Sequence, residues 1–185
     1  MNNKKIILIC HGQGEQAFLE GIIHKYVNAN SNIYIPVKTI APDVKLHRTS
    51  TQINNLVEVF RKSLLFNMEV INGSSPLFII MVDIGERDQN KELEDQYISG
   101  QMKTKLYSII DETLEVKEPS ILLLYSQKGI ENAICEVYPE LEEKNGTRHI
   151  RKAKSSLSVD LFLKSELSQS NLNRLKPFLD KCIVI

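Results

Sequence analysis

The sequence predicts an α/β fold, with a mostly parallel central sheet flanked by helices and a helical C-terminal segment. Short apolar runs of strand length recur along the chain, and longer amphipathic stretches separate them. The runs at residues 6–10 and 77–82 contain no charged residue, as expected of strands buried in a parallel sheet. This alternation is typical of βαβ units.

Two strands and two helices are predicted in the first part of the chain. Residues 5–10 form the first strand, and a helix over about residues 15–28 follows it. The alternation in residues 33–37 predicts a second strand, in which Pro36 indicates an edge position or a strand end. A second helix is expected over about residues 52–66. The inward stripe of the first helix consists of Phe18, Leu19, Ile22, Ile23 and Tyr26.

Two further strands and longer helical segments are predicted after the turn at residues 72–75. Residues 76–83 form a central strand, and residues 121–125 form a fourth. Between them we expect a long helix over about residues 91–114, weakened in its middle by Gly100. The polar C-terminal part has apolar repeats that predict one or two helices packing on the sheet.

The composition indicates one soluble globular domain. The chain has 185 residues, 42% hydrophobic and 25% charged, and its 23 basic residues balance 23 acidic ones. This balance gives no whole-surface attraction to nucleic acid or anionic lipid, although a local patch can still bind either one. We expect a single domain over residues 1–185, with a core over about 4–137 and a helical extension over about 138–185.

The expected location is the cytoplasm, with no membrane association. The N-terminal apolar run is too short for a signal peptide, and no later run is long enough to cross a bilayer. The three cysteines are far apart and have no zinc-site spacing, so we expect small buried hydrophobic residues in a reducing compartment. They are Cys10, Cys135 and Cys182.

Acidic residues and one histidine follow the predicted strands. Because parallel strands bring their carboxyl ends to one edge of the sheet, these residues are expected in one neighbourhood. Carboxylate oxygens are the natural ligands of Mg²⁺ and Mn²⁺, and such a site suits phosphoryl chemistry. Acidic residues at turns and helix starts also serve as ordinary caps, so this pattern by itself leaves both interpretations open. The residues concerned are His11, Glu15, Asp83, Glu86, Asp88 and Glu131.

The order of these motifs resembles Toprim-like domains of OLD-family nucleases and RloB-type phage-defence proteins. In that family the first strand ends in Glu-Gly, a second Glu lies four residues after the first, and a helix follows. A later strand ends in Asp-x-Asp, and a further strand precedes a Ser and then a Glu. Here Glu15 matches the second Glu, Asp83 the first Asp, and Ser126 and Glu131 the last element loosely. The resemblance spans about residues 4–137.

The resemblance implies a metal-dependent nuclease that cleaves DNA or RNA, in antiphage defence. It implies Mg²⁺ or Mn²⁺ held by Glu15 and Asp83, with His11 and Asp88 in support. Lys128 is then expected near the scissile phosphate, and Glu131 belongs to the catalytic set. Members of this family often work beside a separate ATPase of the ABC or AAA type, which is the partner that the resemblance implies. An oligomer is compatible with it.

Two departures from the family pattern open an alternative. His11 stands where the first Glu is expected, and Gly85 where the second Asp is expected. A neutral imidazole binds Mn²⁺ or Zn²⁺ but is a poor Mg²⁺ ligand. Either Asp88 or Glu86 replaces the missing acid, or the chain is a degenerate Toprim-like subunit that binds a partner protein.

Other nucleotide and hydrolase chemistries fit the sequence less well. His11-Gly12-Gln13-Gly14 is similar to an oxyanion segment of α/β-hydrolases, but the segment around Ser126 lacks the first glycine of a nucleophile elbow. Gly12 and Gly14 are too few for a dinucleotide fingerprint, and the sequence has no Gly-Lys-Ser/Thr phosphate-binding loop. Hydrolysis of ATP by this chain alone is therefore not expected.

Overall fold

The computed structural model describes part of the chain in detail. The described residues are 3–10, 13–32, 34–40, 52–83, 100–126, 135 and 171–183. Within these, the description covers the backbone but not the side chains of residues 13–15, 52–56, 82, 83 and 126.

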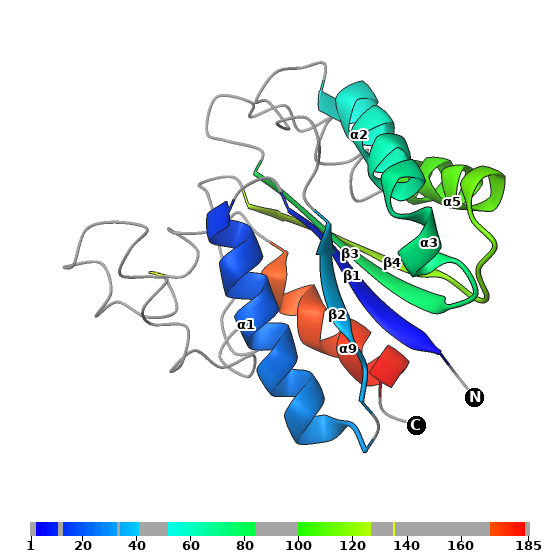
Figure 1. The fold of residues 1–185 in the computed structure, drawn as a ribbon. Helices are drawn as coiled ribbons and strands as arrows, with labels where there is room; N and C mark the ends of the chain where they lie inside the picture. The colour runs from blue at the N-terminus through cyan, green and yellow to red at the C-terminus, as the bar shows by residue number, and fades with distance from the viewer. Residues whose placement is uncertain are drawn as a thin grey trace.

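In the part of the chain that the structure describes, four parallel strands form the central sheet. In spatial order they are β2 (Val37–Ile40), β1 (Lys4–Cys10), β3 (Ser75–Asp83) and β4 (Ser120–Ser126) (Figure 1). All three strand pairs are parallel. The α/β fold with a parallel sheet, predicted from the sequence, is therefore confirmed.

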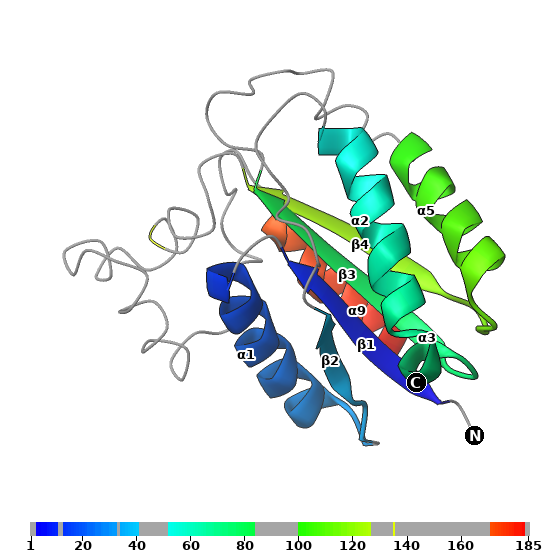
Figure 2. The same ribbon diagram turned by 45° about the horizontal axis from the view of Figure 1, so that its top comes forward.

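Helices cover both faces of the sheet (Figures 1 and 2). One face carries α1 (Gln13–Asn30) and the C-terminal helix α9 (Leu175–Ile183), which follows the short 3₁₀ helix η2 (Leu172–Arg174). The opposite face carries α2 (Gln52–Phe66), α3 (Met68–Ile71) and α5 (Gln101–Thr113). The described elements therefore form three layers, helix–sheet–helix, with α1 and α9 in one helical layer and α2, α3 and α5 in the other.

Strand β1 explains why its sequence is a continuous apolar run. Ile6 and Leu8 pack with α1 and α9, whereas Ile7 and Ile9 pack with α2 and α5. All four side chains are fully buried. Because successive side chains point to opposite faces of a strand, a strand covered on both faces needs apolar residues at every position. Each such buried aliphatic side chain stabilises the fold by about 1.5–3 kcal/mol.

Several predicted elements are confirmed. The predicted inward stripe of the first helix is buried in α1, and the bounds of α2 match the predicted residues 52–66. The predicted C-terminal helical packing is present in α9, where Leu175, Leu179 and Ile183 enter the same core as β1.

The second strand differs from its predicted position. It begins at Val37 and ends at Ile40, instead of spanning residues 33–37. Pro36 has no amide hydrogen to donate to a ladder, and it contributes only its carbonyl oxygen, which accepts a hydrogen bond from the amide of Ile6 at 2.9 Å. The strand therefore forms after the proline. In the described part of the sheet β2 is an edge strand, as the proline had indicated.

The long helix predicted over residues 91–114 does not continue through Gly100. Gly100 has φ 79°, in the left-handed region, and helix α5 begins at the next residue. A left-handed residue interrupts the helical hydrogen-bond ladder, and glycine adopts it without a steric penalty. The Gly100 carbonyl accepts a hydrogen bond from the Thr104 amide at 2.9 Å, so the glycine is the N-cap of α5. The predicted residues 91–99 lie outside the described part of the chain.

The cysteines only partly match their prediction. Cys10 is buried at the end of β1, but Cys135 and Cys182 are partly exposed. The half-exposed position of Cys182 follows from α9, which buries its leucines and turns its other side toward solvent. Among the described residues, no helix has the length and apolar character needed to cross a membrane.

Candidate functional site at the carboxyl edge of the sheet

The carboxyl ends of β1, β3 and β4 lie side by side. Cys10, the last residue of β1, is in register with Met81 of β3, and Met81 is in register with Leu124 of β4. Two residues further along, Asp83 and Ser126 are paired across the last two strands. Chain segments that are far apart in sequence therefore end at nearly the same level of one sheet edge (Figure 1).

The boundary between β1 and β3 is a topological switch point. After β1 the chain enters α1 on one face of the sheet, whereas the next described helix after β3 is α5 on the other face. Open parallel sheets with the strand order 2-1-3-4 bind ligands at the carboxyl ends of the strands, where the order reverses in this way. Strand ends Cys10 and Asp83 flank this boundary.

Helix α1 begins at this edge of the sheet. It starts at Gln13, directly after the two residues that follow β1, and Glu15 lies in its first turn. The amino terminus of a helix carries a partial positive charge and unpaired N–H groups, which favour nearby anions. The backbone of Glu15 is thus located at the same edge as the last residues of β1 and β3.

Two of the predicted site residues are located by their backbones. Asp83 is the last residue of β3, and Glu15 is in the first turn of α1, although neither side chain is described. The other predicted site residues lie outside the described residues. These are His11, Asp88, Lys128 and Glu131.

Among the residues that the structure describes, no three His, Cys, Asp or Glu side chains lie close enough to share a metal ion. This statement does not cover Glu15 and Asp83, because their side chains are not described. The donor set of Glu15 and Asp83 agrees in kind with Mg²⁺ or Mn²⁺, which are held by one or two carboxylates together with water and substrate oxygens.

A residue that sequence reasoning missed holds the end of β4. The side chain of Asn171 is buried, and its Oδ1 accepts a hydrogen bond from the Tyr125 amide at 2.7 Å. Its Nδ2 donates to the Leu123 carbonyl at 2.9 Å, and its own backbone amide donates to the Tyr125 carbonyl at 3.3 Å. The side-chain amide therefore acts like one peptide group of a further strand, at the edge of β4 next to Ser126.

The sequence offered only a weak signal for this role. An Asn before an apolar helical pattern predicts an N-cap, and Asn171 does precede η2. Its side chain caps nothing there and turns instead to β4, which lies 46–48 residues earlier in the chain. A contact of that sequence separation cannot be derived from local spacing.

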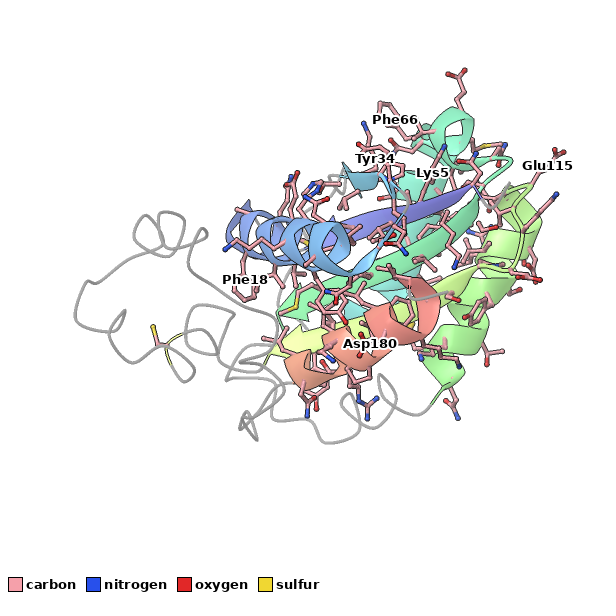
Figure 3. All side chains as sticks on the ribbon, turned by 90° about the horizontal axis from the view of Figure 1, so that it is seen from below. Lys5, Phe18, Tyr34, Phe66, Glu115 and Asp180 are labelled. Atoms are coloured by element: carbon pink, nitrogen blue, oxygen red, sulfur yellow. The ribbon has the colours of Figure 1, made fainter. Side chains whose placement is uncertain are left out.

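The helix that follows Asn171 is connected to the other elements of the fold. The Tyr26 hydroxyl of α1 donates to the Asp180 carboxylate of α9, and the Lys176 ammonium donates to the same carboxylate at 2.8 Å. Lys4 of β1 donates to the Cys182 carbonyl at 2.6 Å. Figure 3 shows Asp180 on this helix. One C-terminal segment therefore contacts α1, β1 and β4 together.

A scan against protein-family models found no match, and neither the search of the curated proteins nor the search of the solved structures found one.

Proposed function

We propose that this protein is a metal-dependent nuclease of the Toprim-like kind, which cleaves phosphodiester bonds of DNA or RNA at the carboxyl edge of its sheet. The observation that supports it is the register of the strand ends. Asp83 ends β3 beside the end of β1, and Glu15 lies in the helical turn that follows β1. An acidic residue from each side of a topological switch point suits a shared cation and a phosphate substrate.

In this proposal Glu15 and Asp83 hold Mg²⁺ or Mn²⁺, and His11 and Asp88 complete the ligand set. Such an ion neutralises charge on a phosphodiester and lowers the pKa of a bound water. Lys128 then balances the charge of the scissile phosphate, and Glu131 completes the acidic set. Both follow the end of β4, whose last residue is paired with Asp83.

The proposal also includes a partner and a cellular role. The resemblance to Toprim-like domains supports both, because members of that family often work beside a separate ATPase, and this sequence has no Gly-Lys-Ser/Thr phosphate-binding loop of its own. We therefore propose a cytoplasmic nuclease with a separate ABC- or AAA-type ATPase as partner, in antiphage defence.

The test measures nicking of supercoiled plasmid and cleavage of RNA with Mg²⁺, with Mn²⁺ and with EDTA. Wild type is compared with Glu15→Gln and Asp83→Asn, which keep side-chain size and remove the charge. Each variant is expected to lower cleavage by about 100-fold or more, because a lost metal ligand removes several kcal/mol of transition-state stabilisation. Matched controls are Glu20→Gln in the same helix and Asp111→Asn on the exposed side of α5, both expected to cleave like wild type.

Metal-dependent cleavage that survives in both site variants would overturn the proposal, because the activity would then belong to another site or to a contaminant. Absence of any metal-dependent cleavage by wild type would overturn it as well. The second outcome favours the degenerate, partner-binding subunit, to which the His11 and Gly85 departures point.

A further inference from the structure

We infer that Asn171 is a positioning residue of the proposed site, which holds the carboxyl end of β4 in place beside Asp83. As a statement about cleavage, this inference rests on the proposed function. As a statement about β4, it rests on the hydrogen bonds alone.

The contact satisfies both edge groups of one residue of β4. The amide and the carbonyl of Tyr125 are both bonded to Asn171, and the Leu123 carbonyl is bonded to its side chain. All of these groups lie in a buried environment, since Asn171 and Tyr125 are each less than a tenth exposed. Buried backbone groups without partners are costly, so this segment of β4 depends on the side-chain amide of Asn171.

Only an asparagine-like side chain fits these partners. The contact needs one acceptor for the Tyr125 amide and one donor for the Leu123 carbonyl in the same short side chain. Aspartate supplies the acceptor but has no donor, and it brings a second oxygen against a carbonyl. Alanine supplies neither group.

The position of β4 bears on the site through its last residue. Ser126 directly follows Tyr125 and is paired with Asp83, the proposed metal ligand. Lys128 and Glu131 follow Ser126 in sequence. A shift of Tyr125 therefore also shifts Ser126 and its pairing with Asp83, and a displacement of about 1 Å can lower a rate by about 100-fold.

Asn171 can act in this way because its own position is determined by the core. After it, Leu172 and Leu175 are buried in the core cluster that also contains side chains of the sheet and α1. The Tyr26–Asp180 and Lys4–Cys182 hydrogen bonds hold the same segment to α1 and β1. Through the segment that follows it, Asn171 thus links the end of β4 to helix α1, whose first turn contains the proposed ligand Glu15.

The experiment compares Asn171→Ala and Asn171→Asp with Asn72→Ala, assayed well below their melting temperatures. Asn72 is the matched control because its Oδ1 also accepts a backbone amide, that of Glu115 at 3.0 Å, but at the opposite edge of the sheet. We expect both Asn171 variants to lower kcat by about 10- to 100-fold with KM little changed. The Asn72 variant is expected to keep the wild-type kcat.

A second measurement needs no catalytic activity. Amide exchange followed by NMR is expected to become about tenfold faster or more at Tyr125 in Asn171→Ala, with unchanged exchange at Leu8 of β1. Wild-type exchange at Tyr125 in this variant would overturn the inference about β4. A folded Asn171→Ala protein with kcat within twofold of wild type would overturn the positioning role while leaving the proposed nuclease intact. If wild type does not cleave at all, the proposed function fails, and the exchange result alone decides whether Asn171 holds β4.

Discussion

The two edges of the sheet differ in the residues that lie at them. At the amino edge, short connections lead from helices into strands, at residues 31–36, 72–74 and 114–119. At the carboxyl edge, β1 passes into α1 through two residues, and β3 ends in the acidic residue Asp83 beside the end of β4. Residues 41–51, 84–99 and 127–134, which follow β2, β3 and β4, lie outside the described part of the chain.

The amino edge is closed by hydrogen bonds between its own connections. The Gly73 amide donates to the Glu115 carbonyl at 2.8 Å, and the Glu115 amide donates to Asn72 Oδ1 at 3.0 Å. The Lys117 amide donates to the Ser74 carbonyl at 2.9 Å. The two turns thus supply hydrogen-bond partners for each other's backbone N–H and C=O groups, and this stabilises the fold.

This difference predicts that changes at the two edges affect different properties of the protein, stability at one edge and activity at the other. The carboxyl ends of parallel strands are where binding and catalytic groups collect, on a scaffold that the rest of the sheet keeps rigid. Changes at the amino edge should therefore alter stability and leave the proposed cleavage intact. Conservative changes at the carboxyl edge should do the reverse.

The largest expected effect is on stability, and it tests whether the two edges of the sheet unfold together as one cooperative unit. Phe78 in β3 is fully buried and meets Phe60 of α2 edge-to-face, with ring centroids 5.6 Å apart. Phe78→Ala is expected to lower the free energy of unfolding by about 3–5 kcal/mol, measured by urea denaturation. Phe66→Ala is the matched control, because Phe66 is 89% exposed at the end of α2 (Figure 3) and should change stability by less than about 0.5 kcal/mol. Loss of amide protection at one sheet edge only would contradict a single unit.

The next prediction concerns the amino edge alone. Gly73 has φ 70°, in the left-handed region, and no atom lies within 4 Å of the position a Cβ would take. Gly73→Ala is therefore opposed by backbone strain and not by crowding, and it should cost about 1–2 kcal/mol in thermal or urea unfolding. Gly73→Asn should cost less, because asparagine tolerates this conformation. A cleavage rate that falls with the Gly73→Ala change, at a temperature where the protein stays folded, would argue against the separation of the two edges.

Much of this fold could be predicted because strands buried on both faces of a parallel sheet appear in the sequence as continuous apolar runs. The apolar run at residues 76–83 lies within β3, and the run at 121–125 lies within β4. The apolar stripe of helix α1 could be predicted because a helix that packs one face on a sheet repeats its apolar residues at helical spacing. The start of β2 was misplaced because alternation at Ile33 and Ile35 looked like a strand, although the ladder depends on amide donors and Pro36 has none.

The candidate site was predictable only to the level of the backbone. That Asp83 and Ser126 end side by side follows from parallel strands of similar length, and the register bears this out. Which donors share a metal depends on side-chain positions after the strand ends, which no periodicity encodes, so the metal site stays a prediction. Asn171 was missed for a related reason, because its partners are distant in sequence.

A smaller effect is expected at the far end of α1, next to the amino edge. The Tyr26 hydroxyl donates to Asp180 of α9, and the tyrosine is otherwise buried. Tyr26→Phe keeps the ring and removes the hydrogen bond, so it should lower unfolding free energy by about 1 kcal/mol. The proposed cleavage should be unchanged if α1 is held mainly by its apolar stripe. A marked loss of kcat would show instead that the carboxyl-terminal end of this helix controls its first turn, which lies at the carboxyl edge of the sheet.

The smallest effect is expected between the edges, on the face that carries α2 and α5. Arg61 Nη1 lies 3.2 Å from Glu112 Oε2, and the two side chains are 43% and 53% exposed. At that exposure water and salt screen the charges, so a double-mutant cycle with Arg61→Ala and Glu112→Ala should give a coupling of about 0.2–0.5 kcal/mol at low salt. About 1 M NaCl should reduce it toward zero, since the screening length is then about 3 Å. A coupling that stays above about 1 kcal/mol at high salt would mean that this pair is more shielded from solvent than its exposure indicates, and that α2 and α5 are joined by more than their apolar contact.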